Sequence, residues 1–371
     1  MSHTQLMPIL SHPYRTNPYC FDIEVTARCN LACFYCYIST HPHQDMTESA
    51  ADAILQFIDR QRDFHPAWRP MELNLYGGEP FLNFPIVQRL VEGLAEPRIY
   101  TIFTNGATAT REQVAWCQEH GVTSKRSTAG CPQAAALTRP GAYTERWLRE
   151  GEWWGDYAAT HRLTVTPATA RYVRKSVAWL HDNGYCAPID LATDDYVEWP
   201  PEAQASYEKQ LTWLADDFIE SFPSGHAVAL ENFSNFGRCI FGQPDVMVLG
   251  CGAGRNTVGI RWDGKAIVPC HRFFRTAGEW PSLQESAPRF ADIFQERFAA
   301  DADGWETDQC NCCCARQCCP HGCLHVSLVT GGTVNFQSEH RCRFIRHYAK
   351  LARQINAALA PAKWWEGMAG T

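Results

Sequence analysis

Strand-like and helix-like patterns of apolar residues alternate between about residue 20 and residue 220. The strand-like runs are short, aliphatic or β-branched, and each is followed by Gly, Pro, Asn or Asp; they lie at 21–26, 72–76, 98–103, 122–126, 162–166 and 189–192. Helical spacing fills the intervals, at 48–62, 85–95, 111–119, 170–183 and 203–221. Six successive β/α units predict an α/β fold, with a parallel sheet that curls into a partial (β/α)6 barrel similar to a TIM barrel.

Two threonines mark helix starts within this region. Thr47 and Thr110 each precede a helical pattern, where a hydroxyl can accept a hydrogen bond from the first turn. In such barrels the functional loops follow the carboxyl ends of the strands. We therefore expect the functional residues at that end of the sheet.

From about residue 225 the pattern changes. Gly, Cys and short strand-like pieces dominate, a hairpin is predicted at 259–269 with its turn at Asp263-Gly264, and a helical tail follows at 341–360. We therefore divide the chain into an N-terminal extension at 1–19, a partial barrel at 20–224 and a small Cys-rich α+β domain at 225–371.

The first loop of the predicted barrel carries Cys29, Cys33 and Cys36. Three thiolates on one short loop can hold three irons of a [4Fe–4S] cluster, which leaves the fourth iron open to another molecule. Short Cys spacings also occur in zinc sites and in the disulfides of secreted proteins. Zinc sites usually pair two Cys with two further ligands at a similar spacing, and the sequence has no such pair near 29–36.

Composition and charge narrow the setting. The chain has 371 residues, a formal net charge of −7 and 18 Cys. It has no signal-peptide pattern at its start and no apolar run as long as a membrane span. We expect a cytoplasmic protein without a nucleic-acid or membrane partner, in which thiols stay reduced and ligate metal.

The Cys triplet resembles that of the radical SAM superfamily, and two further motifs extend the resemblance. Gly77-Gly78-Glu79-Pro80 follows the second strand, and in the family this motif binds the amino group of S-adenosylmethionine. The glycines let backbone approach a ligand, and Glu79 offers an acceptor to an ammonium group. Thr104-Asn105-Gly106 ends the third strand, as in many family members. Each motif alone also fits a simple turn. The resemblance implies reductive cleavage of S-adenosylmethionine to a 5′-deoxyadenosyl radical.

The loop after the fourth predicted strand reads Ser127-Thr128-Ala129-Gly130. Relatives often carry Ser-x-Asp-Gly here, and that Ser and a later Arg contact the cofactor. Ser127 and Arg139 match those positions. Ala129 is a departure that removes a carboxylate found in many peptide-modifying relatives. The alternative for Ser127 is an ordinary turn hydrogen bond.

The C-terminal cysteines resemble the SPASM domain, which binds two auxiliary [4Fe–4S] clusters. Seven of the 18 Cys lie between residues 310 and 323, and five residues instead of the usual four separate the hairpin Gly264 from the next Cys. The resemblance implies three clusters in all. The first auxiliary cluster would use Cys251, Cys270 and Cys323, with Cys239 as fourth ligand or an open iron. The second would use Cys310, Cys313, Cys319 and Cys342. Cys312, Cys314 and Cys318 are surplus to the pattern.

His271 follows one of these cysteines, in the stretch Pro269-Cys270-His271-Arg272-Phe273. This stretch is common among SPASM enzymes that modify ribosomal peptides. In anaerobic sulfatase maturases the residue after this Cys is an acid that serves as base, so His271 is the candidate catalytic base. The alternative is a histidine that bonds to cluster sulfur.

These motifs predict a radical SAM/SPASM enzyme that oxidises or cross-links a ribosomally made peptide or protein side chain, for example through a thioether. The expected partners are that substrate and an electron donor such as flavodoxin or ferredoxin. The hairpin at 259–269 could offer a sheet edge to an extended peptide. Only 28 residues precede Cys29, which leaves no room for the leader-binding domain of many peptide maturases. The alternative substrate is therefore a small natural-product intermediate, such as a sugar or nucleoside.

Overall fold

The computed structural model describes most of the chain. The described residues are 20–38, 40–62, 71–94, 99–142, 158–185, 187–242, 252–254, 257–283, 308–319, 322–333, 336–360 and 362–365. Cys251 lies outside them. Within the described residues, no helix is both long and apolar enough to cross a membrane.

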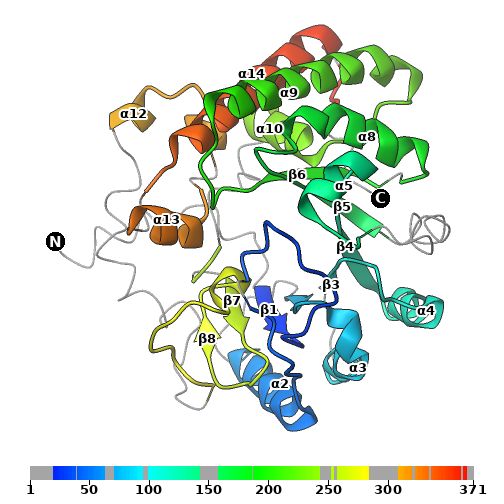
Figure 1. Ribbon diagram of the computed structural model, residues 1–371, viewed down its shortest axis with the longest axis vertical. Helices are drawn as coiled ribbons and strands as arrows, with labels where there is room; N and C mark the ends of the chain where they lie inside the picture. The colour runs from blue at the N-terminus through cyan, green and yellow to red at the C-terminus, as the bar shows by residue number, and fades with distance from the viewer. Residues whose placement is uncertain are drawn as a thin grey trace.

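A single curved sheet organises the molecule (Figure 1). Its order is β6-β5-β4-β3-β2-β1-β7-β8, and all neighbours are parallel except the pair β7–β8. The sheet is an open arc, which confirms the predicted partial barrel. The strands are β1 (Cys20–Glu24), β2 (Glu72–Tyr76), β3 (Ile99–Thr104), β4 (Val122–Thr128), β5 (Ala158–Val165), β6 (Ile189–Thr193), β7 (Thr257–Ile260) and β8 (Ile267–Val268).

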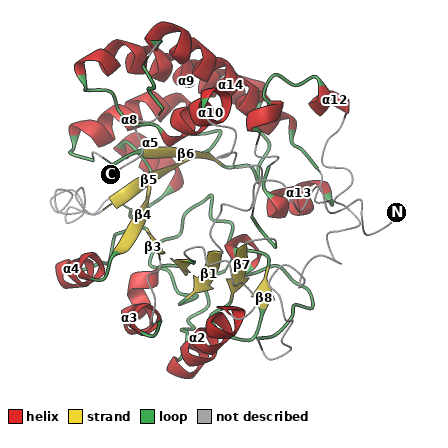
Figure 2. Ribbon diagram, turned by 180° about the vertical axis from the view of Figure 1, so that it is seen from behind, coloured by secondary structure: helices red, strands yellow, loops and turns green. Residues whose placement is uncertain are grey.

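Helices cover the outer side of this arc (Figure 2). They are α2 (Glu48–Arg62), α3 (Phe84–Glu92), α4 (Arg111–Glu119), α5 (Pro132–Thr138), α8 (Val173–Asp182) and α9 (Pro201–Ser221). Thr110 forms the expected capping box with Gln113, and Thr47 accepts the backbone N–H of Ala50 at 3.2 Å. The sequence reading missed α5, a short Ala-rich helix that begins at a proline.

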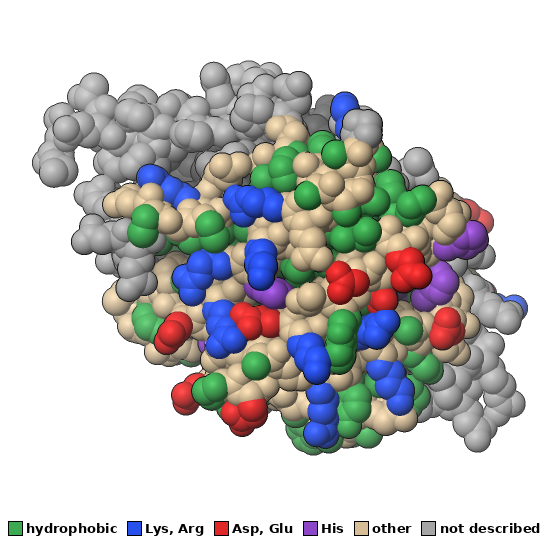
Figure 3. All heavy atoms as spheres, turned by 90° about the horizontal axis from the view of Figure 1, so that it is seen from above, with side chains coloured by type: hydrophobic (Ala, Val, Ile, Leu, Met, Phe, Trp, Pro, Cys, Tyr) green, Lys and Arg blue, Asp and Glu red, His purple; other side chains and the backbone are tan. Residues whose placement is uncertain are grey.

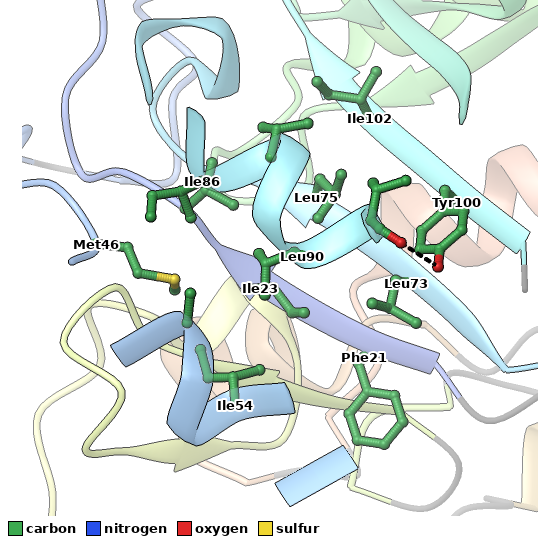
Figure 4. Packing of buried hydrophobic residues seen from close by; sticks show 14 of the residues in the cluster. Phe21, Ile23, Met46, Ile54, Leu73, Leu75, Ile86, Leu90, Tyr100 and Ile102 are labelled. Carbon is green, nitrogen blue, oxygen red and sulfur yellow. Dashed lines mark hydrogen bonds between the residues drawn. The ribbon is translucent and has the colours of Figure 1, made fainter. Parts of the chain in front are cut away.

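The core beneath β1–β3 is apolar, as the alternation of each strand requires. Phe21, Ile23, Leu73 and Leu75 point from the sheet toward α2 and α3 and are fully buried (Figure 4). The opposite positions of β1 and β2 carry Asp22, Glu72 and Asn74, which face the inside of the arc. The sequence pattern therefore yields an apolar outer layer and a polar interior.

The residues after 225 continue this fold. The helices α10 (Glu231–Phe241) and α14 (Glu339–Leu359) share one buried apolar cluster with α8 and α9. The predicted hairpin forms, but β7 pairs in parallel with β1 and so extends the barrel sheet. Residues on the two sides of 224 therefore share a sheet and a core.

Two further details concern the hairpin and the helical surface. The backbone N–H of Ile267 in β8 donates to the carbonyl oxygen of Pro281 at 2.8 Å, so this edge position is already paired. Seen from above, the molecule carries basic and acidic side chains interspersed (Figure 3).

The remaining described α-helices of the Cys-rich region are α12 (Asp308–Asn311) and α13 (Leu324–Gly331).

Candidate functional site

The Cys29, Cys33 and Cys36 loop follows β1, and all three thiols are half-buried. Burial raises the pKa of Cys29 to about 11, and the nearby charges of Glu79, Cys33 and Cys36 act in the same direction. The Cys36 sulfur lies 3.6 Å from Nε2 of His41, a neighbour that the sequence reading did not single out. The three thiols thus share one partly dry site at the carboxyl edge of the sheet.

The glycines of the Gly77-Gly78-Glu79-Pro80 motif lie against this loop. A Cβ at Gly77 would stand 2.6 Å from the Thr26 carbonyl oxygen, and one at Gly78 would overlap the Arg28 carbonyl. The backbone N–H groups of Gly78 and Glu79 donate to the carbonyls of Thr26 and Arg28, at 3.0 and 2.8 Å. We expected these glycines to admit a ligand. In the structure, the missing side chains of Gly77 and Gly78 let their backbone pack closely against the Cys loop.

Glu79 is fully buried, and its carboxylate binds protein donors. It accepts the hydroxyl of Thr104 at 2.7 Å, the backbone N–H of Asn105 at 2.7 Å and that of Phe81 at 3.2 Å. Burial raises the pKa of Glu79, and these hydrogen bonds oppose the rise. The Glu79 carboxylate therefore links the end of β2 to the end of β3 through hydrogen bonds. This structural role is separate from the predicted contact with an ammonium group.

The other expected cofactor residues lie around the same edge. The side chain of Asn105 donates to Asn30 at 2.9 Å and stands 4.0 Å from the Cys29 sulfur. Ser127 occupies an inward position of β4. Arg139 is buried at the end of α5, close enough for its charge to act on Cys36 and Glu79. The fold therefore brings Asn105 and Arg139 to the Cys loop and places Ser127 near the carboxyl end of β4.

A cavity of about 590 Å³ occupies the inside of the arc. It is lined by inward-facing residues of every strand except β8 and by residues of the Cys-rich region. The charged lining residues are Asp22, Glu72, Lys125, Arg162, Asp190, Asp195, Arg272 and Arg341. Tyr37, which follows Cys36, contacts two of the lining residues, His271 and Arg272. This polar chamber is the candidate substrate site.

His271 lies in the wall of the cavity and is held by Asp22. The Asp22 carboxylate lies 2.7 Å from Nδ1 of His271 and also accepts its backbone N–H at 3.0 Å, while Asn74 donates to the other oxygen at 2.9 Å. The imidazole stacks on Tyr76, with ring centroids 4.1 Å apart. Burial lowers the pKa of His271, although Asp22 opposes this shift. Nδ1–H therefore faces Asp22, and Nε2 keeps a free lone pair.

The cysteines that the sequence predicts as ligands of further clusters fall into two places. Cys270 and Cys323 line the cavity. Burial raises the pKa of the Cys342 thiol, and the nearby thiols of Cys310 and Cys313 act in the same direction. These three cysteines therefore lie close together.

Cys239 belongs with the second of these groups. It packs against the same buried cluster as Cys313 and Cys319, with Cys318 in that cluster. Cys312 and Cys314 are exposed, and Cys318 is buried.

The donor chemistry fits iron–sulfur clusters, because thiolates are their usual ligands. Among the described residues, no three His, Cys, Asp or Glu are grouped closely enough for a single metal ion. A cluster spreads its ligands around several irons, so its thiols stand further apart than those of one ion. The Cys29, Cys33 and Cys36 loop suits such a group.

Comparison with known proteins supports the assignment of the barrel. The model of the radical SAM superfamily matches residues 23–124. An uncharacterized protein of Methanocaldococcus jannaschii is 34% identical over 74 residues, which cover 19% of this chain and 22% of that protein's length. The chain therefore matches about a fifth of this relative.

Solved structures match nearly the whole chain. The structure of anSMEcpe with bound AdoMet has a TM-score of 0.76 at 19% identity, over 95% of this chain and 98% of that one. A second anSMEcpe structure, with AdoMet and the Cp18Cys peptide, has a TM-score of 0.71 at 19% identity, over 92% and 99%. SuiB of Streptococcus suis bound to the precursor peptide SuiA has a TM-score of 0.60 at 15% identity, over 88% and 76%. At these identities the likeness establishes the fold.

Proposed function

We propose that this chain, which carries a radical SAM domain, cleaves S-adenosylmethionine reductively and oxidises or cross-links a peptide or protein side chain. The observation that carries the proposal is one arrangement. A three-thiol loop, whose neighbouring Tyr37 packs on His271, lies beside a charged cavity that is lined by two further cysteines and by the Asp22–His271 pair. Peptides bound to anSMEcpe and SuiB favour a peptide over a small natural product.

Three clusters would be held by residues that the chain supplies. Cys29, Cys33 and Cys36 would hold the first. Auxiliary clusters would use the remaining predicted ligands, which are Cys251, Cys270 and Cys323 for one and Cys310, Cys313, Cys319 and Cys342 for the other. When bound, they supply the electron that splits S-adenosylmethionine into methionine and the 5′-deoxyadenosyl radical, and an acceptor for one substrate electron.

The cofactor-positioning residues of this proposal surround the Cys loop. Ser127 and Arg139 would contact S-adenosylmethionine, with Arg139 as the cation for its carboxylate. The amino group of S-adenosylmethionine would bind at the edge formed by Gly77, Gly78 and Glu79. Thr104 and Asn105 hold the carboxylate of Glu79 in place there.

The chain's own chemical step is a proton transfer. A substrate carbon that has given a hydrogen atom to the 5′-deoxyadenosyl radical and an electron to an acceptor must also lose a proton from itself or its neighbouring heteroatom. Nε2 of His271 would accept that proton, because Asp22 holds Nδ1–H and fixes the tautomer. His271 would be the catalytic base, and Asp22 a positioning residue.

Deuterium transfer tests the substrate class. Reconstituted enzyme is incubated under reducing conditions with deuterated candidates, namely a co-encoded peptide in one arm and sugars or nucleosides in the other. Deuterium in 5′-deoxyadenosine from the peptide alone is the expected result. Label arriving only from a small molecule would overturn the peptide assignment and leave the radical chemistry intact.

A further inference from the structure

Lys125 is a cation of the cavity without a carboxylate partner among the described residues. It lies on the inward face of β4 and lines the cavity, and its only described interaction is with the ring of Phe103, whose centroid is 5.8 Å from Nζ. The other basic lining residues are engaged: Arg162 with Asp190 at 3.4 Å, Arg341 with Asp195, and Arg272 with the rings of Tyr37 and Tyr196.

A half-buried ammonium without a counter-charge is costly, because the cavity wall replaces part of its hydration. The cation–π contact with a ring face offsets only a fraction of this desolvation cost. The site therefore favours any ligand that brings a negative charge to Nζ.

Arg162 adds a second positive charge to the same region. It projects inward from β5, the neighbour of β4, and lines the same cavity as Lys125, Tyr76 and His271. Asp190 is the one carboxylate described within ion-pair distance of these two cations. Arg162 therefore has an ion-pair partner, whereas no ion pair among the described residues involves Lys125.

Aromatic rings join this positive region to the proposed base. Lys125 lies over Phe103, Phe103 stacks on Tyr76 at 4.1 Å, and Tyr76 stacks on His271 at 4.1 Å. These side chains come from β4, β3, β2 and the turn after β8, so they form a continuous strip across the arc. A ligand lying along the strip would have one end at Lys125 and the other at His271.

We propose that the substrate carries a carboxylate that binds Lys125, while its reacting carbon lies near His271. This assignment rests on the proposed function, because it takes His271 as the site of proton removal. The carboxylate of S-adenosylmethionine is a poorer occupant. Lys125 lies two residues before Ser127 on the same face of β4, about 7 Å deeper than the cofactor edge, whereas Arg162 is level with Ser127 and pairs with Asp190. Arg139 already supplies a cation at that edge.

The test compares ligands that differ only in charge. Reconstituted enzyme saturated with S-adenosylmethionine is titrated calorimetrically with two matched pairs. One pair is a six-residue peptide with a single central Glu and the same peptide with Gln. The other is glutaramate and its neutral diamide, glutaramide. The proteins are wild type, Lys125→Met, Lys125→Arg and Lys209→Met. Lys209 is the matched control, because its ammonium also lies over a ring, that of Trp213 at 4.7 Å, on the exposed surface of α9.

We expect wild type to bind the carboxylate member of a pair about ten- to hundredfold more tightly than its amide, the usual range for a charged hydrogen bond. Lys125→Met should remove this preference, Lys125→Arg should keep most of it, and Lys209→Met should keep all of it. A preference confined to the peptide pair identifies a peptide side chain, and one shared by both pairs identifies a free acid as well.

Three results would overturn the proposal. They are no preference in either pair, a preference that survives in Lys125→Met, and a parallel loss of affinity for S-adenosylmethionine in that variant, which would assign the carboxylate to the cofactor. Melting temperatures show whether each variant is folded. Formation of 5′-deoxyadenosine by wild type without any added ligand tests the radical chemistry separately, so a failure of the carboxylate site is distinguishable from a failure of the proposed function.

Discussion

Asp22 on β1 and His271 after β8 are 249 residues apart in sequence, yet the Asp22 carboxylate lies 2.7 Å from Nδ1 of the imidazole. The contact exists because β7 pairs with β1 and brings the hairpin beside the first strand. It joins the barrel to the residue that follows a predicted cluster ligand. The pair therefore couples the orientation of His271 to the barrel sheet.

Asp22→Asn tests that coupling. The amide can still bond to the ring but favours the other tautomer, so Nε2 no longer presents its lone pair. We expect substrate turnover to fall about hundredfold, within the usual range for losing general base catalysis. Product is measured by mass spectrometry at saturating substrate. Asp52→Asn, which removes a carboxylate that pairs with Arg89 on the outer helices, is the control. Equal rates in Asp22→Asn and this control would rule out the positioning role.

Glu79→Ala should destabilise the Cys loop. The change leaves the buried N–H groups of Asn105 and Phe81 without their acceptor, at a cost of about 3 kcal/mol in the free energy of unfolding. Denaturant unfolding and iron analysis of the reconstituted protein measure the effect, with loss of iron from the first site expected. Glu79→Gln keeps one acceptor oxygen and should lose less. Unchanged iron and stability in Glu79→Ala would contradict this structural role.

Replacing Cys29, Cys33 and Cys36 together by Ala should remove about four of about twelve irons per chain, because one of three clusters loses its ligands. Cys117→Ala is the control, since this thiol is buried in the apolar core beneath α4. A wild-type content near four irons would refute the auxiliary clusters.

His161 should make stability fall in acid. Burial and the charge of Arg126 lower the pKa of His161 from 6.5 to about 3. Below pH 6.5 the unfolded chain binds a proton that the folded chain excludes, so unfolding becomes easier by about 1.4 kcal/mol per pH unit.

Denaturant unfolding between pH 7.5 and 5.5 measures this slope. His161→Leu should lose this component, and His181→Leu, an exposed change on α8, should keep it. Parallel slopes in wild type and His161→Leu would contradict the assignment.

Much of the barrel could be predicted because its signals are local. The strand at Glu72–Tyr76 and the helices at Glu48–Arg62 and Arg111–Glu119 have the bounds that their apolar spacing and caps predicted. The pairing of β7 with β1 could not be predicted, because it joins segments more than 230 residues apart without a local signal.

The chemistry of the site divides in the same way. Motif spacing predicted the Cys triplet and Glu79 as site residues. A sequence cannot show that the Glu79 carboxylate accepts hydrogen bonds from Thr104, Asn105 and Phe81. From the sequence alone, Glu79 was predicted only to accept a hydrogen bond from an ammonium group. Asp22 and Lys125 went unnoticed because an isolated charged residue within a strand resembles any polar position until the inside of the arc is known.

The most direct test of the central claim is formation of 5′-deoxyadenosine. Anaerobically reconstituted and reduced protein is incubated with S-adenosylmethionine, and the nucleoside and methionine are quantified by liquid chromatography. We predict that wild type forms 5′-deoxyadenosine and methionine in equal amounts and that Cys117→Ala does the same. The variant that replaces Cys29, Cys33 and Cys36 should form neither product. Absence of 5′-deoxyadenosine from wild type with a full complement of iron, or its equal formation by the triple variant, would contradict the account.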